Sequence, residues 1–360
     1  MAASATAELV ARGARVAPFE GVEVVAHFGD PDREWRAARE GAAVVPAGYR
    51  QLIAASGGDR VDFLQGMLTN DVRRLAPGAG CYAALLTQNG KVVSDLRVYA
   101  DPACLLLDVL AWRAAPLRAH LERFLVADDV ELEAAAAQPL LHLEGPLALA
   151  VAGEALGAEA LPAAPLAHAT VGFAGQPLRV VRASEAGGDG LLLSGAAGLA
   201  ARLFDACREA GAVPAGLLAL DRLRIEAGVP WPGIDMDEAT LLMETGREAA
   251  IAFGKGCYLG QEVVERVAAR GHVNRRIGGV LLAGDALPPR GTALLAGGRE
   301  VGYVTSSTRS PLFARPIALA MIQHKHGTVG ERLQRADDGS EAIVAALPFS
   351  PAGAEEDTEG

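Results

Sequence analysis

The sequence predicts an α+β protein built from two α+β units followed by a C-terminal β-barrel. Three observations lead to this prediction. The chain has 360 residues, more than one ordinary core of roughly 100–200 residues accommodates. A similar order of strands and helices occurs twice along the first three quarters. From Arg275 onward, short strands and Gly/Pro turns dominate, as in a small barrel.

Composition and net charge argue against several classes of function. Hydrophobic residues make up 51%, charged residues 21%, and the net charge is −11. This acidic balance argues against broad capture of nucleic acids or anionic membranes. The four cysteines are scattered without a CxxC pair, so neither a zinc ribbon nor a disulfide framework is predicted. We expect a cytoplasmic protein with no membrane span and no direct nucleic-acid contact; its oligomeric state stays open.

The first unit begins with a strand at residues 51–55 and a helix in which Val61, Leu64 and Leu68 recur at helical spacing. Two strands, 82–88 and 91–99, flank Asn89-Gly90. That dipeptide accepts the positive φ angles of a type I′ turn, which predicts a hairpin. A strand at 105–109 and a helix at 112–125 follow.

The second unit repeats this order less regularly. Strands are predicted at 140–143, 178–182 and 191–193, and helices at 197–210 and 217–227.

The predicted layout divides the chain into five parts. Residues 1–18 are expected to be poorly ordered, and 349–360 to form a disordered acidic tail. The first α+β unit covers 19–138, the second covers 139–272, and the barrel covers 273–348.

The most distinctive segment is FGKGCYLGQE at residues 253–262. Its glycines permit tight turns and close backbone approach to a ligand. A predicted helix start after Cys257, together with Lys255, would favour the thiolate form of that cysteine. Cys257 and Lys255 are therefore candidate catalytic residues. The alternative, an inert cysteine in a glycine-rich turn, has about equal weight.

Two further segments carry candidate site residues. Asp95 follows the predicted hairpin turn, and its carboxylate would orient or deprotonate an amine; the alternative is a cross-strand ion pair on a solvated face. Arg224, on the predicted helix at 217–227, would suit a ligand carboxylate. Its alternative is a charged helix surface. The histidines lack metal-binding spacing, so no metal site is predicted.

Four segments together resemble one family. They are residues 63–72, 89–96, 223–228 and 255–262, in the order found in YgfZ-type proteins, which are relatives of the glycine-cleavage T-protein, an aminomethyltransferase. The resemblance covers most of the chain. It implies a three-domain cloverleaf holding tetrahydrofolate or a derivative, with Asp95, Arg224, Tyr258, Gln261 and Glu262 as cofactor-binding residues.

The resemblance also implies partners and a function. YgfZ-type proteins suggest a role in assembling or repairing iron–sulfur clusters, including those of tRNA-modifying enzymes, with iron–sulfur proteins as partners. T-proteins carry two adjacent acids where this chain has Ser94-Asp95, and another acid at a position that matches Leu192. These departures weigh against aminomethyl transfer.

Three hypotheses follow from these residues. The leading one is a folate-binding accessory protein for iron–sulfur clusters that acts through Cys257. The second is a T-protein-like, tetrahydrofolate-dependent aminomethyltransferase. The third is a non-catalytic interaction scaffold. Whether the chain is an enzyme stays open at this point.

Overall fold

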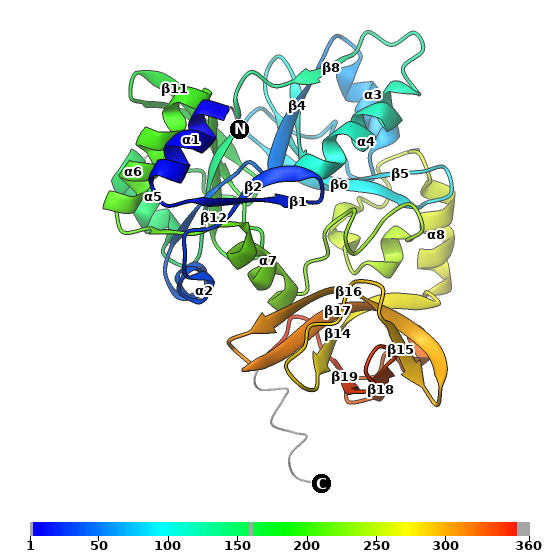
Figure 1. The fold of residues 1–360 in the computed structure, drawn as a ribbon. Coiled ribbons are helices and arrows are strands. Elements are labelled where there is room, and N and C mark those ends of the chain that lie inside the picture. The colour runs from blue at the N-terminus through cyan, green and yellow to red at the C-terminus, as the bar shows by residue number, and fades with distance from the viewer. Residues whose placement is uncertain (1–2, 158–160, 351–360) are drawn as a thin grey trace. The chain divides into compact units, whose positions relative to one another are not determined.

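The computed structural model describes residues 3–157 and 161–350 (Figure 1). Within these residues the chain forms two compact units, neither of which is continuous in sequence. Unit 1 contains the chain up to Leu86, Val93–Leu220 and Ala249–Leu259. Unit 2 contains Thr87–Val92, Asp221–Glu248 and the chain from Gly260.

The first sheet of unit 1 has five strands in the order β5-β6-β7-β4-β8. These strands are β5 (Gly80–Leu86), β6 (Val92–Ala100), β7 (Leu105–Leu110), β4 (Arg50–Ser56) and β8 (Glu131–Ala134). Because side chains alternate along a strand, Leu85 of β5 and Leu96 of β6 join one apolar core. Helices α3 (Arg60–Met67) and α4 (Ala111–Glu122) contribute Leu64 and Leu117 to that core. Intervening positions place Arg50, Asp95, Arg97 and Asp108 on the other face, which is called the polar face below, together with apolar residues such as Leu86.

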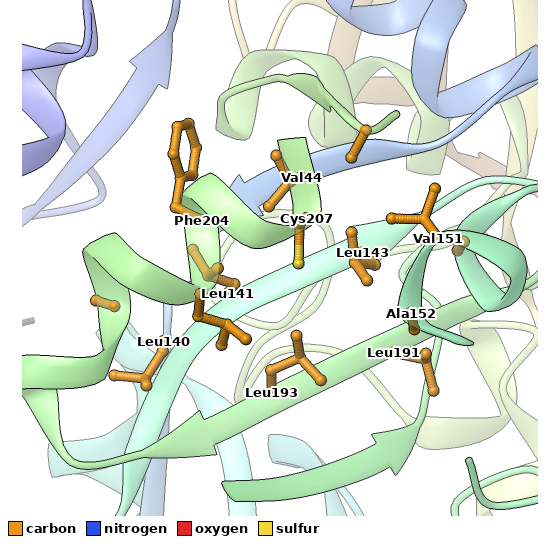
Figure 2. Packing of buried hydrophobic residues seen from close by; sticks show 14 of the residues in the cluster. Val44, Leu140, Leu141, Leu143, Val151, Ala152, Leu191, Leu193, Phe204 and Cys207 are labelled. Carbon is orange, nitrogen blue, oxygen red and sulfur yellow. The ribbon is translucent and has the colours of Figure 1, made fainter. Parts of the chain in front are cut away.

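The second sheet of unit 1 has six strands in the order β10-β11-β12-β9-β3-β13. These are β10 (His168–Phe173), β11 (Gln176–Arg182), β12 (Gly190–Gly195), β9 (Gln138–Glu144), β3 (Ala43–Pro46) and β13 (Val213–Pro214). Helices α5 (Ala148–Leu156) and α6 (Ala200–Glu209) pack on it. Cys207 of α6 lies in the same buried cluster as Val44, Leu141 and Leu143 (Figure 2).

Unit 2 contains a closed six-stranded barrel in the order β14-β17-β16-β15-β18-β19 (Figure 1). The strands are β14 (Arg275–Leu282), β15 (Ala293–Ala296), β16 (Arg299–Ser310), β17 (Arg315–Gln323), β18 (Arg332–Arg335) and β19 (Glu341–Ala345). Helix α8 (Gln261–Arg270) precedes the barrel. The predicted fold class, two α+β domains and a C-terminal barrel, is confirmed.

The N-terminal segment differs from the expectation of disorder over residues 1–18. Residues 3–18 contain helix α1 (Ala3–Ala11) and most of β1 (Arg15–Phe19), which pairs with β2 (Val22–His27). Leu9 is fully buried in the core of the second sheet, and Arg12 forms an ion pair with Asp205 at 2.6 Å. Burial of Leu9 and Ala14, the pairing of β1 with β2 and this ion pair are long-range contacts that composition does not indicate.

The C-terminal tail lies largely outside the described residues. Phe349, the first residue of the predicted tail, is buried against Ile317 and Leu319 of the barrel. Its backbone N–H also donates to the carbonyl of Glu226, in helix α7 (Leu217–Glu226). The packed chain therefore continues at least to Phe349.

The turn between β5 and β6 is a hairpin, as predicted, but not of type I′. Only Gly90 has a positive φ, at 70°, and Asn89 does not. The Gly90 N–H donates to the Thr87 carbonyl at 2.9 Å, and the Thr87 N–H donates to the Lys91 carbonyl at 2.8 Å. Gln88 and Asn89 therefore occupy the centre of the turn, and Gly90 takes the left-handed bulge position that follows it.

Candidate functional site

Asp95 lies on β6, on the polar face of the five-stranded sheet. Its side chain is half-buried, and Oδ2 accepts a short hydrogen bond from the Tyr82 hydroxyl on the neighbouring strand β5. The buried Ser94 hydroxyl donates to the Asp95 carbonyl at 2.7 Å. The Asp95 carboxylate is therefore held in one orientation. The Ser94 side chain forms a hydrogen bond to the backbone instead.

A buried network of paired charges occupies the same face. Arg50 of β4 donates to Asp108 of β7 at 2.6 Å and to Glu185 at 3.1 Å. Arg97, two residues after Asp95, also donates to Glu185, at 3.2 Å. Burial would raise the pKa of Glu185, but Arg50 and Arg97 outweigh it and lower this pKa to about 2. Glu185 is therefore held ionised by two guanidinium groups.

The network continues into the six-stranded sheet through β9. His142 Nε2 lies 2.6 Å from Glu144 Oε2. Glu144 accepts further hydrogen bonds from the Ser184 hydroxyl and from the Glu185 N–H. Sequence reasoning missed this network, because its members come from four strands and a loop and share no local pattern.

The segment before α8 is fixed onto α3 and the loop that follows it. The Gln65 amide donates to the Lys255 carbonyl at 3.1 Å, and the Lys255 ammonium donates to the Gln65 carbonyl. The Leu259 N–H donates to the Gly66 carbonyl at 3.0 Å, and the Thr69 hydroxyl to the Ala250 carbonyl at 2.6 Å. Two of the segments singled out in the sequence, 63–72 and 253–262, therefore meet in the fold.

Lys255 is half-buried in this arrangement. Its Nζ lies 5.2 Å from the centre of the Tyr258 ring, within cation–π range. Burial lowers the pKa of Lys255 to about 8, and Asp71 offsets only part of that effect. The nearby Cys81 thiol is partly buried, and this burial raises its pKa to about 12. Lys255 and Tyr258, both predicted site residues, are thus in contact.

Cys257 is exposed. Gly254 and Gly256 on either side of Lys255 have φ angles of 81° and 103°, and a Cβ at either position would meet nothing within 4 Å. Phe253 is 60% exposed. The segment therefore presents an aromatic ring and a thiol to solvent, and the catalytic role of Cys257 stays a prediction.

Gln261 and Glu262 form the first turn of α8. The Gln261 amide donates to Glu265 at 2.6 Å along the helix. Glu262 is exposed in the first turn, where its charge complements the helix dipole. These observations give both residues a local structural role; cofactor binding by either stays a prediction.

Arg224 points into the interior of unit 2. Its side chain is 1% exposed and donates to Asp221 at 2.8 Å, to Ser306 at 2.7 Å, and to Asp235. The guanidinium also stacks on Trp231, 4.7 Å from the ring centre. Neither a charged helix surface nor an open pocket describes this setting. A folate carboxylate would have to displace one of these partners, and folate binding by Arg224 stays a prediction.

The predicted catalytic residues do not form one cluster. Asp95 lies on the polar face of the five-stranded sheet. Lys255 is attached to α3, whose Leu64 packs in the core on the opposite face. Leu192, at a position where T-proteins have an acid, is fully buried in β12. Asp95 is therefore the acid that the site retains.

Comparison with known proteins agrees with this architecture. Residues 5–255 match the GCVT N-terminal domain, and residues 275–350 match the glycine cleavage T-protein C-terminal barrel domain. The chain belongs to the glycine cleavage T-protein family. An aminomethyltransferase of Synechococcus sp. (strain RCC307) is 32% identical over 345 residues, which cover 94% of this chain and 95% of that protein. One of Thermosynechococcus vestitus is 29% identical over 340 residues, covering 94% and 93%.

A solved T-protein has the same fold. The crystal structure of glycine cleavage system aminomethyltransferase T from Bartonella henselae superposes with a TM-score of 0.86 and 23% identity, over 96% of this chain and 97% of that one. No helix in the described part of this T-protein family member is long and apolar enough to cross a membrane.

These relatives overturn the leading functional hypothesis. Proteins similar over nearly the whole chain are named aminomethyltransferases, which favours the alternative hypothesis. The expected role in iron–sulfur cluster assembly or repair through Cys257, including clusters of tRNA-modifying enzymes, is therefore wrong. That hypothesis gave too much weight to one short segment, 255–262, relative to the match along the rest of the T-protein fold.

Proposed function

We propose that this chain is a tetrahydrofolate-dependent aminomethyltransferase, with Asp95 as the carboxylate that handles the amine. The hydrogen bond between Tyr82 and Asp95 is the observation that carries the proposal. The names of relatives that match 94% of the chain support the same reaction class.

The residues fit tetrahydrofolate in part. When bound, the folate supplies amine nitrogens that accept a one-carbon unit. A half-buried carboxylate such as Asp95 is a suitable acceptor for an N–H group of the ligand. Leu192 offers no polar group, and Arg224 is already paired within its own unit. Asp95 is therefore the residue that we expect to hold the folate or the donor amine.

Asp95 can orient an amine and accept a proton from it. The Tyr82 hydroxyl holds Oδ2 in one direction, so that less reorganisation is needed when a ligand binds. The charge network on the same face holds β6 in place, because Arg97 pairs with both Glu185 and Asp108. Removal of the Tyr82 hydroxyl should therefore weaken binding through orientation of Asp95.

The run at residues 255–262 supports a finer assignment to the YgfZ-type branch of the T-protein family. The scattered free cysteines support residence in the cytoplasm. Both assignments are proposals. Neither alters the reaction class that we propose.

Titration with tetrahydrofolate, followed by a transfer assay, tests the function. Binding is measured by calorimetry, and turnover by glycine cleavage reconstituted with the remaining glycine cleavage system proteins of a relative. We expect micromolar to millimolar binding. Asp95→Asn should reduce turnover by about 10²-fold or more, as for loss of a positioned acid–base group.

Two variants serve as controls. Tyr82→Phe should retain the fold and lose about tenfold in affinity or rate, since only the orienting hydrogen bond is removed. Asp62→Asn, at a 75% exposed side chain, should change neither. Absence of folate binding, or full turnover by Asp95→Asn, would contradict the proposal.

A further inference from the structure

Lysine is rare in this chain. Of the 33 basic residues, only Lys91, Lys255 and Lys325 are lysines, and the rest are arginines. Arginine stays charged under all ordinary conditions, whereas a buried lysine releases its proton and becomes a nucleophile. Lys91 and Lys255 are both half-buried, whereas Lys325 is exposed. Of the two, Lys255 is the one with an aromatic ring beside its Nζ.

The contacts of Lys255 suit a nitrogen with a single proton to donate. Among the described residues, the only oxygen in hydrogen-bond contact with Nζ is the Gln65 carbonyl. An ammonium group has three N–H donors, and the Gln65 carbonyl accepts one of them. A protonated iminium, R–NH⁺=CHR′, has one N–H, which the Gln65 carbonyl satisfies.

The remaining surroundings favour the same species. The Tyr258 ring, 5.2 Å from Nζ, stabilises a cation without accepting a hydrogen bond. Asp71 acts on Lys255 only through longer-range electrostatics. The open space beside Gly254 and Gly256 leaves a route for a small reactant.

We propose that Lys255 is a covalent attachment site for small aldehydes, which its Nζ captures as an iminium between the Gln65 carbonyl and the Tyr258 ring. The neutral amine attacks the carbonyl carbon to form a C–N bond, and the carbonyl oxygen takes up the proton that the nitrogen releases. The hydroxyl of this carbinolamine then takes a second proton and leaves as water. In total, an ammonium group and an aldehyde give an iminium and water.

The protonation state of Lys255 supports the first step. With the pKa of Lys255 lowered by burial to about 8, about one side chain in ten is neutral at pH 7. For an ordinary lysine the fraction is about one in 3000. The inference stands apart from the folate reaction proposed above, because it uses neither Asp95 nor a folate.

Reductive trapping on the full chain tests the inference. The protein is incubated at pH 7 with acetaldehyde and cyanoborohydride, and ethylation of each lysine is followed over time by peptide mass spectrometry. Lys91, whose Nζ donates to the Ala239 carbonyl at 2.9 Å, and Lys325 are internal controls. We expect Lys255 to be ethylated at least tenfold faster than either, with a rate that levels off above about pH 8.

Two variants at Tyr258 test the role of the ring. Tyr258→Phe keeps the ring and should trap within twofold of the unmodified chain, whereas Tyr258→Leu should be at least fivefold slower. Circular dichroism checks that both are folded. Ethylation of Lys255 in the unmodified chain no faster than of Lys91 and Lys325 would overturn the proposal, whatever the folding of the variants. Equal trapping by Tyr258→Leu would also overturn it.

Discussion

Arg50 and Glu185 form a buried ion pair, 3.1 Å apart, although 135 residues separate them in the sequence. Their side chains are only 6% and 3% exposed. The attraction within a buried ion pair adds little to the free energy of unfolding, because both charges lose their hydration. Removal of one partner is strongly destabilising, because it leaves the other charge buried and unpaired. The pair therefore fixes which segments of unit 1 lie together.

Replacement of Glu185 by glutamine should destabilise the protein. The neutral amide would leave Arg50 and Arg97 with one carboxylate fewer in a buried setting, at a cost of about 3 kcal/mol. Urea unfolding followed by circular dichroism measures the change. The matched control is Asp285→Asn, whose 89% exposed side chain pairs with Arg309; it should change stability by less than about 0.5 kcal/mol.

The same substitution should remove part of the acid sensitivity. The pKa of Glu185 in the folded protein is lowered to about 2, from an ordinary value near 4.5. Its contribution is therefore complete above about pH 4.5 and is lost as the pH falls towards 2. The difference in unfolding free energy between the original chain and Glu185→Gln should shrink across that window. A constant difference between pH 5 and pH 2.5 would show that Glu185 is not held ionised.

Lys255 should show the opposite dependence. Burial lowers its pKa to about 8 in the folded protein, so the unfolded chain binds the proton more tightly. Stability should therefore rise with pH between about 8 and 10.5. Lys255→Met should flatten that rise and should raise stability at pH 7 by about 1 kcal/mol, a figure kept small because solvent screens this half-exposed group. A variant that is less stable at pH 7 would contradict the assignment.

Arg224 should be needed for stability of the unit that contains the barrel. Arg224→Met leaves Asp235, whose side chain is fully buried, without its cation. We expect a loss of about 3 kcal/mol or more in thermal and urea unfolding. Arg309→Met, at an exposed ion pair, is the control. Unchanged stability together with weaker folate binding would instead support the ligand role predicted for Arg224.

The cysteines should differ strongly in alkylation. Cys257 is exposed, whereas burial raises the pKa of both Cys81 and Cys207 to about 12. Iodoacetamide at pH 7.5 should label Cys257 at least a hundredfold faster than Cys207, as read by peptide mass spectrometry. Comparable labelling of Cys207 in the folded chain would mean that α6 opens readily.

Local sequence patterns predicted the helices and strands better than the long-range contacts between them. Alternating residues and turn dipeptides located the hairpin and the barrel, because these depend on neighbours in sequence. The turn type was wrong because Gly90, and not Asn89, takes the positive φ.

Arg224 and Glu185 could not be placed from sequence. Their partners, Ser306 and Arg50, lie 82 and 135 residues away. Asp95 was found because it follows a recognisable turn, and its hydrogen bond to Tyr82 spans only 13 residues.

The hairpin tip has a consequence for synthesis of the protein. Residues 87–92 belong to unit 2, where Lys91 donates to Ala239, 148 residues later. A ribosome adds roughly 5–20 residues per second, so about 7–30 s pass between the synthesis of Lys91 and the synthesis of Ala239. During that interval the hairpin tip lacks its partner near Ala239. The strands of unit 1 must therefore form before the tip between β5 and β6 has its own contacts. A nascent chain stalled before residue 239 should therefore be the form most dependent on chaperones.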